Sequence, residues 1–334
     1  MRRIYVTGTA GFIGFHLAGL LLEQGFRVHG YDGFTPYYDV KLKRDRQALL
    51  ERHAGFTSTE AMLEDSDRLL ADISAFAPDV IVHLAAQAGV RYSLEAPRSY
   101  ISGNIEGTFN VLEAARAVGV AHLLIASTSS VYGANTRMPY RETDKADSQV
   151  SLYAATKKAC ESMSHAYADL HGIPTTLFRF FTVYGPWGRP DMAPFLFTRA
   201  ILANEPIKVF GEGRMYRDFT YVTDLVRGIR GLIDAVPERG RPVAEGDSLS
   251  PVAPWRVVNI GNGDKVALMD FIDAIEAATG IPAIRELAGM QKGDVRATWA
   301  DNSLLQHLTG YRPQTGVREG IAQFVEWYRG YYGN

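Results

Sequence analysis

A glycine-rich turn near the N-terminus constrains the fold of this chain more than any other feature. Gly8, Gly11 and Gly14 directly follow a short β-rich segment at residues 2–7, and apolar residues recur at helical spacing after the turn, over residues 12–24. Glycine is required there because a Cβ would block either an incoming ligand or the packing of the helix on the strand. The order of strand, turn and helix predicts the first unit of an α/β domain, with an anion site at the helix N-terminus.

The next predicted strand ends on an acidic residue suited to a ribose. Residues 27–31 predict this strand, and Asp32 stands at its end. A carboxylate there accepts both hydroxyls of an adenosine ribose and repels a 2′-phosphate, while the helix start at Phe12 and Ile13 faces a pyrophosphate. These features favour NAD over NADP. A glycine-rich helix cap and an ordinary turn aspartate stay open as purely structural alternatives.

Alternating strands and helices extend this unit over the first half of the chain. Further strands are expected at residues 79–84, 122–127 and 175–180, and helices at 65–76, 105–117 and 152–170. Such alternation is typical of an α/β fold with a doubly wound parallel Rossmann sheet and right-handed crossovers.

The pattern changes after Tyr184, where Pro and Gly punctuate shorter elements and predict a smaller α/β C-terminal domain. Its expected elements are helices at 193–202, 223–235, 268–279 and 317–328 and a strand at 207–210. Residues 236–255 predict a solvated loop. We expect an NAD-binding Rossmann domain over residues 1–184 and a cap domain over 185–334, with some exchange of chain between the two.

Charge and cysteine content exclude several function classes. The 35 Lys and Arg residues nearly balance the 37 Asp and Glu residues, which argues against a nucleic-acid surface or a polybasic membrane patch. Cys160 is the single cysteine, so a disulfide framework is excluded, and the eight histidines lack the spacing of a metal site. There is no uncharged apolar run of ~18 residues and no leader-like start. We expect a soluble, cytoplasmic protein with no metal, nucleic-acid or membrane partner.

Two motifs predict proton-transfer chemistry. Tyr153 and Lys157 are four apart on the helix expected over residues 152–170, so both lie on one face. Lowering a tyrosine pKa from ~10 towards ~7 takes about 4 kcal/mol, which one ammonium ~4 Å away supplies at an effective dielectric of ~20. Thr128 follows a buried strand, where its hydroxyl can bridge Tyr153 to a substrate oxygen. Taken by itself, the Tyr153–Lys157 pair is also explained by chance spacing on a helix. The Ser/Thr turn at Thr128 is also explained by helix capping.

Together the motifs resemble the extended short-chain dehydrogenase/reductase family of nucleotide-sugar enzymes. The resemblance rests on T-G-T-A-G-F-I-G from Thr7, H-L-A-A from His83, S-T-S-S-V-Y-G from Ser127 and Y-A-A-T-K from Tyr153. Further runs are similar to the UDP-glucuronate 4-epimerase subgroup. They are Y-D-G-F-T-P-Y-Y-D-V-K-L-K from Tyr31, A-A-Q-A-G-V-R-Y-S from Ala85, F-R-F-F-T-V-Y-G-P-W-G-R-P-D-M-A from Phe178, R-D-F from Arg217 and K-G-D-V-R-A-T-W-A-D from Lys292.

The resemblance assigns roles to residues that the pattern alone does not. It implies that Thr128, Tyr153 and Lys157 form the catalytic trio, with NAD held throughout the cycle. Arg217 and Asp294 match positions that in the family meet diphosphate and ribose. The remaining cofactor contacts that it implies are Leu63, Leu84, Ala85, Ala86 and Asn104. Apolar faces on the helices that follow Asn104 and Tyr153 imply a homodimer, although burial against the chain's own sheet explains the same pattern.

The turn after Thr128 favours epimerisation over elimination. Dehydratases of the family place an Asp-Glu pair where this chain has Ser129 and Ser130, so no acid and base for elimination are present. The expected reaction converts UDP-glucuronate to UDP-galacturonate through a transient 4-keto sugar, without decarboxylation. Hydroxyls of Thr128, Ser129, Ser130 and Thr182 are expected to grip the carboxylate. Arg91 and Arg189 are candidate partners for the carboxylate or the diphosphate, or are surface ion-pair residues.

Two departures from the family pattern affect the adenine end of the cofactor site. Met62-Leu63 stands where an Asp-Leu or Asp-Ile pair is usual, and Gly33 replaces an Asn. The backbone of Leu63 can still serve, since an amide can reach an adenine nitrogen without the aspartate. The alternatives are a 4-epimerase of UDP-glucose or UDP-N-acetylglucosamine, a UDP-glucuronate decarboxylase, and a non-catalytic NAD-binding sensor.

Overall fold

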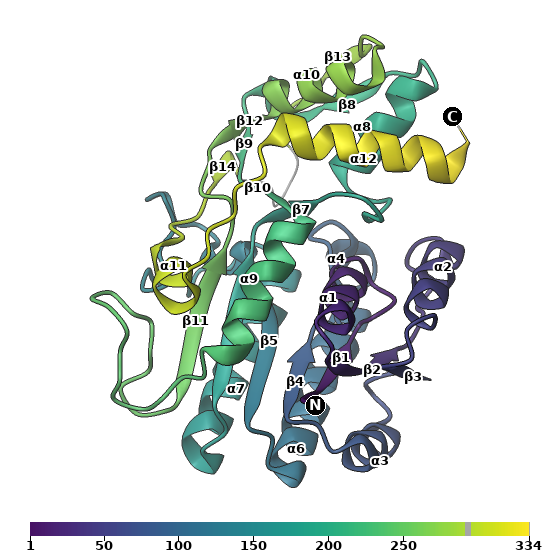
Figure 1. Ribbon diagram of the computed structural model, residues 1–334. Coiled ribbons are helices and arrows are strands. Elements are labelled where there is room, and N and C mark those ends of the chain that lie inside the picture. The colour runs from purple at the N-terminus through teal and green to yellow at the C-terminus, as the bar shows by residue number, and fades with distance from the viewer. Residues whose placement is uncertain (291–294, 334) are drawn as a thin grey trace.

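A seven-stranded parallel sheet forms the centre of the protein in the computed structural model, which describes residues 1–290 and 295–333 (Figure 1). The strand order is β11-β6-β5-β4-β1-β2-β3, and each neighbouring pair is parallel. In chain order the strands are β1 (Arg3–Thr7), β2 (Arg27–Asp32), β3 (Phe56–Glu60), β4 (Val80–His83), β5 (His122–Thr128), β6 (Thr175–Phe180) and β11 (Trp255–Ile260). The predicted doubly wound sheet is confirmed, and its order reverses between β1 and β4, where a ligand crevice is expected.

Helices cover both faces of this sheet. Because side chains alternate along a strand, Ile4 and Val6 pack with α1 and α9, whereas Tyr5 packs on the opposite face with α3 and α6. The helices around the sheet are α1 (Phe12–Glu23), α2 (Val40–Leu50), α3 (Ser66–Phe76), α6 (Gly107–Val118), α7 (Leu152–His171), α9 (Val222–Asp234) and α11 (Ser303–Thr309). Four short elements lie at the sheet's carboxyl edge, namely α4 (Tyr92–Glu95), α5 (Pro97–Tyr100), the π-helical turn η1 (Ile101–Glu106) and the 3₁₀ turn η2 (Ser129–Tyr132).

The predicted smaller α/β part lies beyond the carboxyl ends of the strands (Figure 1). Its helices share a core that includes Phe195, Phe271 and Phe324. Its helical elements are α8 (Ala193–Leu202), η3 (Phe210–Gly213), α10 (Leu268–Thr279) and α12 (Val317–Tyr332). Its strands are β7 (Thr182–Tyr184), β8 (Ile207–Val209), β9 (Tyr216–Arg217), β10 (Phe219–Tyr221), β12 (Val266–Ala267), β13 (Arg285–Leu287) and β14 (Ala297–Thr298).

Two segments of the second half belong to the large sheet instead. The sequence placed a helix at 223–235 among the elements of the smaller part, but α9 packs against α1. Residues 236–254 contain no helix or strand, as predicted, although Asp247 within them forms a buried ion pair with Arg256 at 2.9 Å. The chain then enters β11, a strand that the sequence did not predict. Periodicity identifies a helix but not the layer on which its apolar face packs, and this explains why the helix at 223–235 was assigned to the smaller part.

Candidate active site

A cleft of 1220 Å³ opens at the carboxyl edge of the sheet, between the sheet and the smaller part. It is lined by residues from the turn after β1, from the ends of β2, β4, β5 and β6, and from α8 and β9. Within the described residues, every predicted site residue except Asn104 lines this cleft. Asp294 lies outside the residues that the structure describes.

The glycine turn is shaped by close backbone packing. Gly8 has a φ of +81° and donates its N–H to the carbonyl of Tyr31 at 2.7 Å. A Cβ on Gly8 would lie 2.8 Å from the amide nitrogen of Ala85, and a Cβ on Gly14 would overlap the carbonyl oxygen of Gly8. The glycines thus let α1 start directly against β1 and β4, with its first, internally unpaired amides at the cleft.

Asp32 stands beside that helix start and fits a dinucleotide. Its carboxylate accepts the N–H groups of Ala10 at 3.0 Å and Phe34 at 2.8 Å. Burial raises the pKa of Asp32, while these amides and the charge of Lys43 oppose the shift. A helix N-terminus for the pyrophosphate and an acceptor for the ribose hydroxyls are therefore adjacent, as NAD requires.

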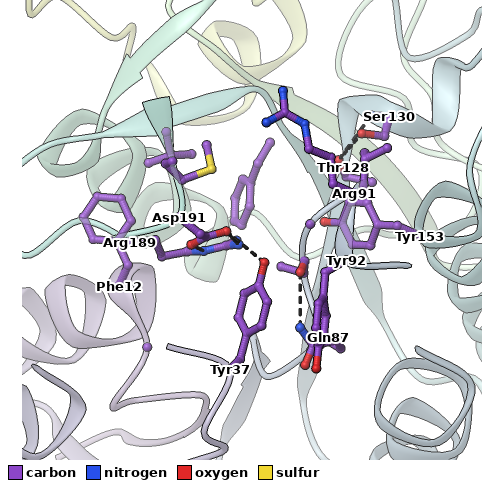
Figure 2. A pocket seen from close by; sticks show the side chains of 18 of the residues that line it. Phe12, Tyr37, Gln87, Arg91, Tyr92, Thr128, Ser130, Tyr153, Arg189 and Asp191 are labelled. Atoms are coloured by element: carbon purple, nitrogen blue, oxygen red, sulfur yellow. Dashed lines mark hydrogen bonds and ion pairs between the residues drawn. The ribbon is translucent and has the colours of Figure 1, made fainter. Parts of the chain in front are cut away.

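Thr128, Tyr153 and Lys157 all line the cleft, and Figure 2 shows Thr128 and Tyr153 on the same side of it. Thr128 ends β5 and donates its hydroxyl hydrogen to Ser130 Oγ at 3.2 Å. Lys157 is buried in α7, and its Nζ donates to the carbonyl of Ala126 at 2.9 Å. This bond ties α7 to β5, so that Tyr153 faces the cleft one turn earlier.

The electrostatics of Tyr153 differ from the sequence-based expectation. Burial raises its pKa, and the groups that lower it are the Thr128 hydroxyl and the Arg189 guanidinium rather than Lys157. The Lys157 ammonium is directed at a backbone carbonyl, and burial lowers its own pKa. Helical spacing places two side chains on one face, but it does not determine where a flexible lysine makes its hydrogen bond.

The substrate side of the cleft is lined by small hydroxyls and by arginines. Ser129, Ser130 and Thr182 line it next to Thr128. Opposite Thr128 and Tyr153, Arg189 pairs with Asp191 at 2.6 Å (Figure 2). Two further predicted contacts also line the cleft: Arg91 lies over the Phe210 ring, and Arg217 donates to backbone carbonyls of β9 and of residue 296.

Asn104 lies behind the cleft rather than in it. Its amide group donates to Gln87 O and to Thr156 Oγ1, both at 3.0 Å, and accepts the N–H of Gln87 at 2.7 Å. The side chain is fully buried in η1 and joins the segment after β4 to α7. Asn104 does not line the cleft, so its contact with the cofactor stays a prediction.

The two departures at the adenine end are spatially coupled. Met62 lines the cleft with Leu63, and a Cβ on Gly33 would overlap the Met62 sulfur. The carbonyl of Leu63 accepts a hydrogen bond from Asn110 at 2.8 Å. The absence of a side chain at position 33 therefore makes room for the methionine.

Sequence reasoning missed several residues around this cleft. Tyr37 donates its hydroxyl to Asp191 at 2.9 Å, and Lys43 donates to the Thr35 carbonyl at 2.8 Å. Tyr37 and Lys43 belong to one of the runs that carry the family resemblance. No periodicity or spacing separated them from surface residues, because their partners are distant or irregular segments of the chain.

Comparison with known proteins agrees with this geometry. Residues 4–243 match the NAD dependent epimerase/dehydratase family. The chain belongs to this family. It is 54% identical over 329 residues to a probable UDP-glucuronate 4-epimerase of Rhizobium meliloti (strain 1021), covering 98% of this chain and 96% of that protein. The resemblance to the extended short-chain dehydrogenase/reductase family, stated from the motifs, is confirmed.

Two solved structures of epimerases share the whole fold. The UDP-glucuronic acid 4-epimerase from Bacillus cereus in complex with UDP-glucuronic acid and NAD superposes with a TM-score of 0.87 at 31% identity, covering 99% of this chain and 100% of that one. The UDP-glucose 4-epimerase of Thermotoga maritima with UDP-glucose gives a TM-score of 0.86 at 29% identity, covering 99% of each chain.

Residues 1–290 and 295–333 contain no group of three or more His, Cys, Asp or Glu side chains placed to hold a metal ion. Over the same residues, no helix combines the length and apolar character needed to cross a bilayer.

The glycine turn gives a matched pair of tests within α1. Gly14→Ala should destabilise the protein by roughly 1–3 kcal/mol through overpacking and should weaken NAD binding. Gly19→Ala meets no atom within 4 Å and should stabilise by ~0.5–1 kcal/mol. Urea unfolding and NAD titration check both; equal effects of the two variants would contradict this account of the turn.

Proposed function

We propose that this protein is an NAD-dependent UDP-glucuronate 4-epimerase, which forms UDP-galacturonate without decarboxylation. The observation that carries the proposal is the run of hydroxyls beside Tyr153, from Thr128, Ser129, Ser130 and Thr182, in a cleft that also receives the dinucleotide turn. Relatives described as UDP-glucuronate 4-epimerases support the same substrate.

The chemistry requires one proton carrier and one hydride acceptor. NAD, when bound, supplies reversible hydride acceptance from C4 of the sugar. Tyr153 accepts the proton of the 4-hydroxyl, either directly or through Thr128, and returns it after the 4-keto sugar has turned its other face. Lys157 anchors α7 on β5 through Ala126. Because hydride and proton both return, no net oxidation results.

The 4-keto form of a glucuronate is a β-keto acid and loses carbon dioxide readily if its carboxylate bond stands perpendicular to the carbonyl plane. The hydroxyl run lies where it can grip the carboxylate from several sides and prevent that alignment. Each such charge-assisted hydrogen bond contributes ~1.5–3 kcal/mol. Neither position 129 nor position 130 carries a carboxylate that could act as acid or base for elimination.

A 4-epimerase of UDP-glucose or UDP-N-acetylglucosamine is the second candidate. It uses the same trio, and the similarity to the UDP-glucose 4-epimerase of Thermotoga maritima favours it.

Incubation with each of the three UDP-sugars, without added nicotinamide, separates the candidates by proton NMR. The coupling of the C4 proton identifies epimerisation, and a pentose signal would identify a decarboxylase. Conversion of none of them would support the non-catalytic sensor.

The pH dependence tests the proton carrier. Tyr153 must be ionised to accept a proton, so turnover should rise with pH through its pKa. Tyr153→Phe should lower kcat by ~10²–10⁴-fold. Since the Thr128 hydroxyl lowers the pKa of Tyr153, Thr128→Ala should move the rising limb to higher pH. Initial rates from pH 6 to 10 check this; an unmoved limb, or one moved to lower pH, counts against the assignment.

The carboxylate clamp is tested at Thr182. Thr182→Ala should weaken UDP-glucuronate binding by about tenfold, equivalent to 1.4 kcal/mol, or release a UDP-pentose, while affecting UDP-glucose binding less. Calorimetry gives the affinities and proton NMR gives the products. The clamp is disproved if the variant shows neither weaker UDP-glucuronate binding nor pentose formation.

The remaining assignments complete the proposal. Residues 1–184 form the proposed NAD-binding domain and also carry the hydroxyl run, whereas residues 185–334 form the proposed nucleotide-sugar cap apart from α9 and β11, which join the large sheet. In this assignment Arg217 meets the diphosphate and Asp294 the ribose. The one cysteine of the chain, Cys160, is buried and unpaired with another cysteine, which supports a reducing compartment. We assign the enzyme to the cytoplasm.

A homodimer built on η1, α6 and α7 is the proposed assembly. Ile101, Phe109 and Leu170, on these adjacent elements, are apolar and 46%, 45% and 75% exposed, respectively, and exposed apolar side chains of this kind are what a helical dimer interface would bury. Phe109→Glu should convert the dimer to monomer in sedimentation velocity. Leu287→Glu, at a 62% exposed position on β13 of the smaller part (Figure 1), is the control; a monomeric wild type would refute the proposal.

A further inference from the structure

Arg46 is a fully buried cation whose hydrogen bonds all go to neutral oxygens. It lies in α2, and its side chain is 0% exposed. Nη1 donates to Ala10 O at 2.9 Å and to the Tyr38 hydroxyl at 2.8 Å. Nη2 donates to Trp187 O at 2.6 Å and to Gly188 O at 3.3 Å. A buried charge whose hydrogen bonds reach only neutral groups is costly, even though the charge of Arg46 also acts on Asp32, where it opposes the rise in pKa that burial causes. The arrangement therefore needs an explanation beyond packing.

These bonds join two segments that face the cleft from opposite halves of the chain. Ala10 belongs to the glycine turn that receives the dinucleotide, whereas Trp187 and Gly188 precede Arg189 on the substrate side. His16 adds a second link from α1, since its Nε2 bonds to Pro186 O at 2.8 Å. Burial lowers the pKa of His16 to about 4, so this ring is neutral near pH 7.

The 185–188 segment is held in a strained conformation. Trp187 has a φ of +59°, in the left-handed region that a bulky side chain rarely adopts. A Cβ on Gly188 would lie 2.9 Å from the carbonyl oxygen of Gly185. Strain of this kind persists only where surrounding contacts determine the conformation, and it concentrates at ligand clamps. Arg46 supplies such contacts by binding two consecutive carbonyls.

Arg189 is the next residue along the chain. Its guanidinium lies in the cleft, 2.6 Å from Asp191 and across from Tyr153 (Figure 2). Its position therefore follows from the 185–188 turn before it and from the Asp191 carboxylate beside it. A shift of that turn would move the guanidinium relative to both the substrate and the tyrosine.

We propose that Arg46 is a positioning residue that fixes Arg189 for the anionic substrate by bracing the 185–188 turn against the dinucleotide turn. The inference rests on the proposed function, because it requires that Arg189 contacts the UDP-sugar. It also implies that the cofactor turn and the substrate arginine behave as one unit rather than as independent sites.

A double-mutant cycle separates this role from a purely structural one. The variants are Arg46→Gln, Arg189→Gln and the double mutant, with Arg52→Gln as the control, since Arg52 is an exposed arginine just after α2. Calorimetry of NAD-loaded protein gives the Kd of UDP-glucuronate, proton NMR gives turnover, and thermal melts report folding. Arg46→Lys replaces Arg46→Gln if the latter does not fold, because it keeps the charge but not the forked geometry.

Arg46→Gln should raise the Kd of UDP-glucuronate about tenfold in the wild-type background and by less than about twofold when Arg189 is already Gln, because coupled residues are non-additive. Arg52→Gln should change neither. An equal effect of Arg46→Gln in both backgrounds, or a lower melting temperature with unchanged Kd, would overturn the inference. If Arg189→Gln leaves the Kd unchanged, the inference fails while the epimerase function stands. If the wild type neither binds nor converts UDP-glucuronate, the proposed function itself fails.

Discussion

The placement of Thr128, Tyr153 and Lys157, the proposed catalytic trio, depends on a buried ion pair between α7 and β6. Glu161 accepts hydrogen bonds from Arg179 Nε and Nη2 at 2.9 and 2.8 Å and from Ser127 Oγ at 2.7 Å. Glu161 lies one helical turn after Lys157, and Ser127 directly precedes Thr128. The pair therefore fixes both the helix and the strand that carry the trio. Leaving either charge buried without its partner would cost far more than losing a surface ion pair.

Hydrogen bonds between uncharged side chains hold the neighbouring strands β1 and β4 in place. His83, at the end of β4, is buried between Thr7 Oγ1 at 2.8 Å and Thr108 Oγ1 at 3.1 Å. Burial and the nearby Lys157 charge lower the pKa of His83 to about 3, so the ring is uncharged. It links β1, β4 and α6 without adding a second cation beside the buried lysine. The floor of the cleft at β1 and β4 is thus held by hydrogen bonds between uncharged groups.

Much of the site could be predicted because its signals are local. The turn from Gly8 to Gly14, the strand-end Asp32 and the helical spacing of Tyr153 and Lys157 each occupy a few consecutive residues. The predicted doubly wound sheet followed from the order of such units. Contacts between segments that are distant in the sequence could not be predicted. Arg46 is one of four basic residues within residues 40–50, and nothing in its neighbours indicates that it reaches Trp187, 141 residues away.

The sequence by itself determined the local features of the protein. These are the positions where a Cβ cannot fit, the residues that share a helix face, and the hydroxyls and carboxylates that follow strands. These properties depend on covalent geometry and short-range sterics, so they are readable from neighbouring residues. Only the tertiary structure decided that α9 and β11 return to the large sheet, that the Lys157 ammonium bonds to Ala126, and that Asn104 lies behind the cleft. Those outcomes depend on burial and on competition among distant hydrogen-bond partners, which exist only once the chain has folded.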